Sequence, residues 1–338
     1  MGRGSVAKDP VTPPLLAGYF GHGNAGDEMI LEMLQRRLGP APFLSGPRPV
    51  GGQGIPRFHF FKLLHHLRRP RALLLGGGEL FQSRTSARSL AYYVSLPLLA
   101  RLLVRPVLGF SLGLDPNLGP LGRWLTAFSL RKALSLWVRD ETSQNFLKQA
   151  GIPSRLMPDV VWAWPVPKIP PPTSFQRVLW IPRFPALEDQ GVSLRTALHS
   201  FPGNIKQGIL ALDPCEDAPA LARFRNGLEI FHRLETWTTP NDLFEVLSRY
   251  DVVVTMRYHG LVAAALAGRP VVAVPGHGKV LDLARELNVP IVNPHAVLST
   301  DWPDVLRRAF EAGAPSAGNR PTRAAAALEE LAAILLFN

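Results

Sequence analysis

The chain has 338 residues, which favours two domains of about 150 residues each over one ordinary core. Hydrophobic residues make up 46% of it and charged residues 19%, a balance that excludes a disordered protein. The formal net charge of +11 favours anionic partners, either phosphorylated substrates or an anionic membrane surface. We expect no nucleic-acid partner, because the positive charge is dispersed and no nucleic-acid-binding motif accompanies it.

The single cysteine, Cys215, excludes an internal disulfide and is typical of a reducing compartment. Its neighbours Asp213, Glu216 and Asp217 are acidic, so we expect a surface thiol rather than a nucleophile. Residues 1–14 lack the apolar core of a signal peptide, and no run of about 18 uncharged apolar residues occurs. We therefore expect a cytoplasmic protein, with peripheral contact at the inner face of an anionic membrane allowed.

The first half of the chain is organised by short apolar runs that predict strands at residues 15–19, 71–75, 106–110 and 134–138. The first strand leads into a glycine-rich loop that contains His22 and Asn24, and Asp27 and Glu28 follow in the first turn of a helix. A capped strand-to-helix turn would explain the glycines. It explains the histidine, the asparagine and the paired carboxylates less well.

The glycine spacing of this loop departs from the dinucleotide-binding fingerprint, so a nicotinamide or flavin cofactor is not favoured. Three further glycines end the second predicted strand. Of these, Gly77 and Gly78 would let the backbone approach a ligand or another loop closely, although a triple glycine is a weak signal by itself.

A proline-rich segment marks the domain boundary. Residues 164–173 contain five prolines, which is typical of a semi-rigid linker. We therefore predict an N-terminal domain over residues 1–163, a C-terminal domain over residues 174–320 and an amphipathic C-terminal helix over residues 321–338.

Cationic side chains follow the predicted strands of the second half. Arg183 follows the strand at 178–181, Arg257 and His259 follow the strand at 251–254, and Lys279 follows the next one. Ligands bind beyond the carboxyl ends of parallel strands. A guanidinium suits a carboxylate or a phosphate, and an imidazole can move a proton. These residues could simply cap and solvate their turns, but together they predict a site where a small anion reacts.

Short motifs stand in a characteristic order along the chain: Gly18–Glu28, Leu74–Gly78, Val138–Asp140 with Ser143, Gly151–Ile152, Pro158–Asp159, Met256–His259 and Lys279–Val280. In this order and spacing they resemble the polysaccharide pyruvyl transferases, most closely the bacterial branch that modifies cell-wall polymers anchoring surface layers. The resemblance extends over about residues 18–287. The sequence departs from the family pattern at residues 276–278 and in the loop after Gly113, which leaves the acceptor open.

The resemblance implies an α/β fold similar to the two-domain GT-B glycosyltransferases, with two Rossmann-like domains facing a cleft. The N-terminal domain would take the acceptor and the C-terminal domain the donor. It also implies phosphoenolpyruvate as the donor substrate, a sugar acceptor carried on a lipid, and no cofactor or metal. The donor-binding arginines and the essential histidine of the family map onto Arg183, Arg257 and His259.

This chemistry predicts a role for each candidate residue. Arg183, Arg257 and Lys279 would bind the carboxylate and phosphate of the donor. His259 would deliver a proton to the vinyl carbon, and Asp27 or Glu28 would act as the base on the acceptor hydroxyls. The remaining substrate contacts are expected from His22, Asn24, Gly77 and Gly78. A GT-B glycosyltransferase using a nucleotide sugar, and a non-catalytic glycan-binding relative, stay open as alternatives.

Overall fold

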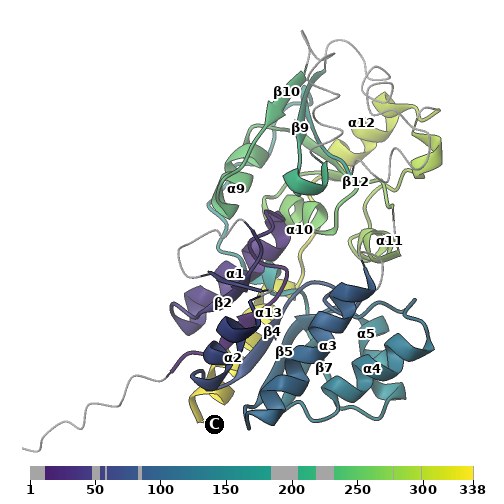
Figure 1. Ribbon diagram of the computed structural model, residues 1–338. Coiled ribbons are helices and arrows are strands. Elements are labelled where there is room, and N and C mark those ends of the chain that lie inside the picture. Colours follow the sequence, from purple (N-terminus) through teal and green to yellow (C-terminus); the bar gives the residue numbers. More distant parts are fainter. Residues whose placement is uncertain are drawn as a thin grey trace, which may run out of the picture. The chain divides into compact units, whose positions relative to one another are not determined.

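The computed structural model describes residues 12–47, 54–57, 59–82, 86–183, 205–217, 232–276, 278–297 and 299–337, with the elements labelled in Figure 1. Residues 1–11 and His277, on which part of the sequence analysis rests, lie outside this range. The chain divides into two compact units. The first comprises the chain up to His22, Asp27–Ala163 and the chain from Thr322 onward; the second comprises Gly23–Gly26 and Trp164–Pro321.

The first unit contains a seven-stranded parallel sheet in the order β3-β2-β1-β4-β5-β6-β7. Every residue of the central strands β1, β4 and β5 is buried, as expected for a parallel sheet covered on both faces. The strands of this sheet are β1 (Leu15–Ala17), β2 (Phe43–Ser45), β3 (Gly54–Pro56), β4 (Leu73–Gly76), β5 (Val107–Leu112), β6 (Ser135–Val138) and β7 (Arg155–Leu156).

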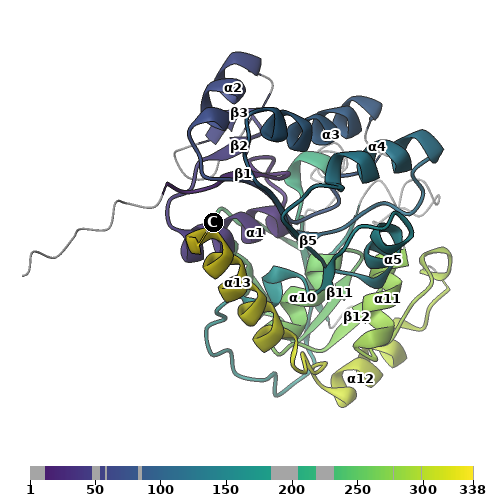
Figure 2. The same cartoon turned by 90° about the horizontal axis from the view of Figure 1, so that it is seen from below.

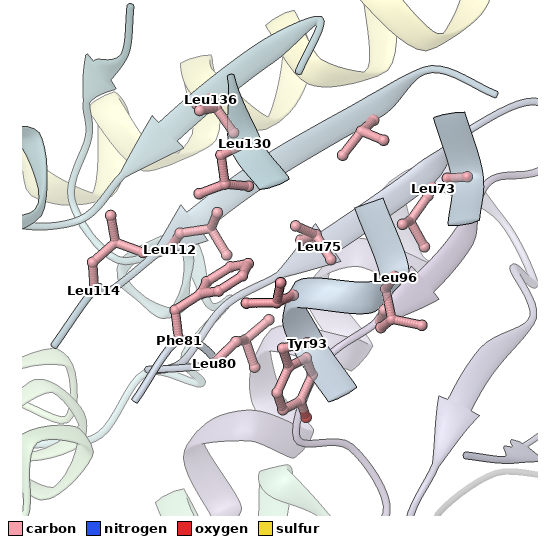
Figure 3. Close-up of a cluster of buried hydrophobic side chains, with 14 of the residues drawn as sticks. Leu73, Leu75, Leu80, Phe81, Tyr93, Leu96, Leu112, Leu114, Leu130 and Leu136 are labelled. Atoms are coloured by element: carbon pink, nitrogen blue, oxygen red, sulfur yellow. The ribbon is translucent and has the colours of Figure 1, made fainter. Parts of the chain in front are cut away.

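Helices cover this sheet on both sides, with α3 and α4 on one side and α1 and α13 on the other (Figure 2). Leucine side chains from the strands and from α3 and α4 form a core that also includes Phe81 and Tyr93 (Figure 3). The helices are α1 (Ala25–Leu38), α2 (Phe60–Arg68), α3 (Ala87–Leu102), α4 (Pro120–Leu130), α5 (Glu141–Gln149) and α13 (Arg320–Phe337).

The C-terminal helix α13 packs on the first unit, although it follows the second unit in sequence. Glu329 of α13 accepts two hydrogen bonds from Arg37 of α1, at 2.8 and 2.5 Å. Glu330 pairs with Arg155 of β7, and Arg71 donates to the Leu336 carbonyl at 3.0 Å. The first unit is therefore built from both ends of the chain.

The second unit contains a five-stranded parallel sheet in the order β10-β9-β8-β11-β12. Its core includes an edge-to-face pair of indoles, Trp180 and Trp302, with ring centroids 5.2 Å apart. The elements are β8 (Arg177–Ile181), β9 (Lys206–Leu210), β10 (His232–Glu235), β11 (Val252–Thr255), β12 (Val271–Ala273), α9 (Pro240–Ser248), α10 (Tyr258–Leu266), α11 (Gly278–Glu286) and α12 (Trp302–Ala312).

Two local details complete the description of the fold. Helix α9 begins at Pro240 with Thr239 as its N-cap, because the Asp242 carboxylate accepts the backbone N–H groups of Thr238 and Thr239 and closes a capping box. The short strands β2, β3 and β7 have only two or three residues each and carry no periodic pattern that a sequence analysis can detect. None of the described helices is long and apolar enough to cross a membrane.

A buried ion pair stabilises the first unit. Arg139, directly after β6, donates from Nη1 to Asp159 at 2.8 Å, and the two side chains are 4% and 0% exposed. The other Asp159 oxygen accepts the backbone N–H of Val161 at 3.0 Å. Such pairs cost much when only one partner is removed, because the remaining charge stays buried without compensation.

We predict that Asp159→Asn lowers the free energy of unfolding by about 3–5 kcal/mol, measured by urea denaturation. The matched control is Glu32→Gln, which removes the carboxylate of an exposed pair with Arg36 in the same unit. That change should cost less than about 1 kcal/mol. Similar losses in the two variants would contradict the special role of the buried pair.

Candidate active site

Three segments of the second unit meet because of the strand order. Strand β8 lies between β9 and β11, so the residues after these three parallel strands share one edge of the sheet. Arg183 follows β8, the segment 211–217 follows β9, and Arg257 follows β11. Ligands bind at this edge in open α/β sheets.

Arg183 and Arg257 meet at one carboxylate, that of Glu216. Arg183 donates to Glu216 Oε1 from Nη2 at 2.8 Å and from Nε at 3.2 Å. Arg257 donates to Oε2 from Nη1 at 2.6 Å. The structure therefore brings these two predicted site residues together, with an acidic side chain between them.

A second carboxylate fixes Arg257. Both oxygens of Asp217 lie 2.8 Å from Arg257 Nη2, and the Asp217 side chain is fully buried. Arg257 Nε donates to the Pro182 carbonyl at 3.3 Å. The guanidinium is thus held by the segments that follow β8 and β9, and only 11% of the Arg257 side chain is exposed.

The two arginines and two carboxylates balance in charge. Burial raises the pKa of Glu216, but hydrogen bonds and the positive charges of Arg183 and Arg257 outweigh burial, so the pKa lies below its ordinary value. Glu216 is therefore ionised at neutral pH. The Glu216 side chain is 29% exposed, whereas the Asp217 side chain is buried. An incoming anion can therefore take the place of Glu216 on the arginines far more readily than that of Asp217.

The segment Gly23–Gly26 docks onto the same acidic segment. Asn24 Nδ2 donates to Asp213 Oδ2 at 3.2 Å, and the Ala25 N–H donates to the Leu212 carbonyl at 2.8 Å. The other oxygen of Asp213 accepts the Glu216 N–H at 3.0 Å. Asp213 therefore connects the glycine-rich loop to Glu216, the residue that both arginines contact.

His259 packs directly on the backbone of this loop. A Cβ placed on Gly26 would lie 1.8 Å from His259 Nδ1, so only glycine leaves room for the imidazole. Arg257 is the N-cap of α10, and His259 lies in the first turn of that helix, because the chain turns helical shortly after β11.

Lys279 lies in the first turn of α11, which follows β12 and packs on α10. Its side chain is half-buried. Lys279 and Arg257 are thus placed beyond the ends of the adjacent strands β12 and β11, as their positions after those strands predict.

The remaining predicted residues belong to the first unit. Glu28 is 2% exposed and accepts the Gly21 N–H at 2.8 Å, so it anchors the loop. Asp27 is 8% exposed. A Cβ on Gly78 would lie 2.7 Å from Asp27 Oδ1, and one on Gly77 would lie 2.4 Å from Ile30. Both glycines have positive φ, and because they lack side chains, helix α1 can pack close to the sheet. Their role is therefore in packing.

His22 is held by a cation and an aromatic ring. Its imidazole stacks on Tyr19 with centroids 4.0 Å apart, and Nε2 lies 2.8 Å from Arg57 Nη1. An arginine only donates, so His22 Nε2 accepts and the ring is neutral in this contact. Arg57 lies 4.9 Å from the centre of the Tyr92 ring, and burial, partly offset by Arg57, raises the pKa of Tyr92 to about 12.

The sequence alone does not identify Asp213, Glu216 and Asp217 as site residues or Arg57 as the partner of His22. In the sequence the three acidic residues stand out only as the surroundings of Cys215, which is exposed as predicted. The sequence shows that they follow an apolar run, which forms β9, but it does not show that β9 pairs with β8. The sequence gives no signal for Arg57, because the strand before it, β3, is too short to recognise.

We predict that Gly26→Ala displaces the His259 ring, because the new methyl group cannot fit beside Nδ1. The proton NMR signals of that ring should shift, and stability should fall by roughly 1–3 kcal/mol from overpacking. Gly119→Ala is the control, since a Cβ there meets nothing within 4 Å. Unchanged His259 signals would rule out the contact.

Glu216→Gln should lower the melting temperature at neutral pH, because an amide replaces the charge between two guanidinium groups. The pKa of Glu216 is depressed by folding, so its stabilising effect is complete above the ordinary value of 4.5 and is lost as the pH falls below it. The melting temperatures of the variant and the wild type should therefore converge in acid. A difference independent of pH would contradict this assignment.

Comparison with solved structures shows the fold. UDP-GlcNAc 2-epimerase from Neisseria meningitidis superposes with a TM-score of 0.63 at 14% identity, covering 96% of this chain and 100% of that one. The S. aureus MnaA–UDP structure gives 0.63 at 10% identity, with 96% and 98% covered. Acinetobacter baumannii MurG gives 0.51 at 14%, with 95% and 98% covered. The chain therefore has an α/β fold of two Rossmann-like units, of the GT-B type.

Sequence comparison gives the family. No curated protein matches the chain. The family model described as polysaccharide pyruvyl transferase matches residues 24–278, which is most of the chain and includes Asn24, Arg183, Arg257 and His259. The chain belongs to the polysaccharide pyruvyl transferase family.

Proposed function

We propose that the chain transfers the three-carbon skeleton of phosphoenolpyruvate to two hydroxyl groups of a sugar in a cell-wall or exopolysaccharide precursor. The products would be a cyclic pyruvate ketal and phosphate. The observation that carries the proposal is the meeting of Arg183 and Arg257 at one partly exposed carboxylate. Two guanidinium groups aimed at one acidic group form a site for a small dianion or trianion.

Glu216 occupies the position that we assign to an acidic group of the donor. Asp217 is buried and would stay with Arg257 as its fixed partner. When Glu216 moves aside, Arg183 and one face of Arg257 become available to a carboxylate or a phosphate. The charge of the incoming group replaces that of Glu216, so the arginines are never left without a counter-charge.

The reaction can be written with atoms balanced. One sugar hydroxyl adds to C2 of phosphoenolpyruvate and loses its proton to the base, while C3 gains a proton and becomes a methyl group. The second hydroxyl then adds to C2 as the C–O bond to phosphate breaks, and its proton leaves with the phosphate or the base. We assign the proton delivery to His259, and the arginines and Lys279 to charge stabilisation as phosphate departs.

We assign the base to Asp27 rather than Glu28. Glu28 is almost fully buried and accepts the Gly21 N–H, which commits it to the loop. Asp27 is the more exposed of the two carboxylates. The acceptor would be a sugar carried on a lipid, and phosphoenolpyruvate would be the only other substrate.

A GT-B glycosyltransferase activity is the second candidate, because the similar solved structures include MurG and two structures named for UDP-GlcNAc or UDP. A non-catalytic glycan-binding protein is the third. Phosphate release distinguishes all three: the transferase releases phosphate from phosphoenolpyruvate only with an acceptor, the glycosyltransferase ignores phosphoenolpyruvate, and the binding protein turns over nothing.

We predict that the wild-type chain releases phosphate from phosphoenolpyruvate with a synthetic or lipid-linked acetamido-sugar acceptor. His259→Ala should lower kcat by about 10²–10⁴-fold. Arg257→Lys should raise the KM for phosphoenolpyruvate, since a point charge loses the two-pronged geometry. Arg177→Lys is the matched control, because Arg177 pairs with Asp251 at the opposite end of β8 from Arg183 in the same unit. Near-normal turnover of His259→Ala would overturn its assigned role.

A further inference from the structure

Helix α4 presents its apolar side chains to solvent. Leu121, Trp124 and Phe128 are 69%, 60% and 45% exposed. They are spaced by three and four residues and so share one face of the helix. The residues that α4 buries are Thr126, Ser129 and Leu130. The outward face of this helix thus carries three large apolar side chains, whereas an ordinary surface helix carries polar side chains there.

The end of α3, the helix that packs beside α4, also exposes apolar side chains. Leu102 and Val104 are 79% and 87% exposed. Helices α3 and α4 lie side by side (Figures 1 and 2) and are in direct contact. Arg101 of α3 lies over the Phe128 ring at 5.8 Å and donates to the Phe128 carbonyl. We call Leu102, Val104, Leu121, Trp124 and Phe128 the α3–α4 surface.

Val104 is held in a backbone conformation that suits glycine. Its φ is +55°, its N–H donates to the Arg101 carbonyl at 3.0 Å, and the Arg105 N–H donates to the Ala100 carbonyl at 2.8 Å. This is a Schellman cap, in which the position of Val104 is usually glycine. A β-branched side chain here is strained, yet it adds nothing to the core. It adds apolar area to the α3–α4 surface.

The surroundings of the α3–α4 surface are basic. Residues 87–138 contain six arginines or lysines and one acidic residue, Asp115, which is 2% exposed. Of the cationic residues, Arg101 and Arg105 lie at the end of α3, and Arg123, Arg131 and Lys132 lie in α4 or directly after it. Arg105 also donates to the Arg68 carbonyl at the end of α2, where Arg68 and Arg69 are exposed.

Charge decides between the possible occupants. A symmetric contact with a second copy would bring this basic rim against itself. An anionic bilayer instead attracts the arginines and lysines, while the tryptophan and leucines enter the boundary between headgroups and acyl chains. We propose that the α3–α4 surface docks the first unit on an anionic lipid membrane. The proposal goes beyond the catalytic function and does not depend on it.

Flotation of the full chain with lipid vesicles tests the proposal. The chain should bind vesicles of phosphatidylcholine mixed with phosphatidylglycerol, and binding should fall between about 0.1 M and about 0.5 M salt because the charges are screened. Vesicles of phosphatidylcholine alone should bind much less. Equal binding to both vesicle types, or no binding to either, would overturn the proposal.

Variants locate the binding surface. Trp124→Ser with Phe128→Ser, and separately Arg131→Gln with Lys132→Gln, should each weaken binding on the order of ten-fold. Arg307→Gln with Arg308→Gln, which changes the net charge equally on exposed α12, should leave binding unchanged. Val104→Gly should raise the melting temperature while weakening binding, which a merely unfolded variant cannot do.

Two further readouts separate the alternatives. Phosphate release with a water-soluble acceptor should be the same in the surface variants and the wild type, so loss of membrane binding is distinguished from failure of the proposed reaction. Sedimentation should show the same mass for the surface variants and for the wild type. A wild-type dimer that the Trp124 and Phe128 changes dissociate would show that a second copy covers the surface and would overturn the proposal.

Discussion

The ion pair between Arg257 and the buried Asp217 is the constraint on which the second unit's candidate site depends. Leaving a fully buried carboxylate without its guanidinium partner costs much free energy. The ion pair therefore holds together the segments that follow β9 and β11. The strand order makes this possible, because β8 lies between those two strands and supplies Pro182 and Arg183. Glu216 is the carboxylate of the cluster that solvent reaches, which is why we propose that an acidic group of the donor takes its place.

The segment Gly23–Gly26 shows how an early loop joins a late site. Asn24 and Ala25 bind the acidic segment, and Gly26 leaves room for the imidazole of His259. Each of these residues lies about 190 positions or more from its partner along the chain. The glycine-rich motif therefore contributes backbone space and hydrogen bonds to the second unit, while Asp27 and Glu28, directly after it, belong to the first unit.

Much of this organisation could be predicted from the sequence. Buried strands such as β11 have an apolar run that is typical of a parallel sheet, and cations that follow such strands are expected at the carboxyl edge of the sheet. The acidic partners could not be found in the same way. Glu216 and Asp217 become site residues only when β9 is known to pair with β8, and sequence patterns do not specify which strands pair. Likewise Arg57 meets His22 through β3, a three-residue strand without periodicity.

The return of α13 to the first unit has a consequence for synthesis. A ribosome makes a chain from its N-terminus, so the strands of the first sheet emerge long before the helix that carries Glu329 and Glu330. Until the residues of α13 leave the exit tunnel, the surface that α13 covers stays exposed to water. The second unit, whose sequence is nearly continuous, can complete its own core before then, so the first unit is begun before the second and finished after it.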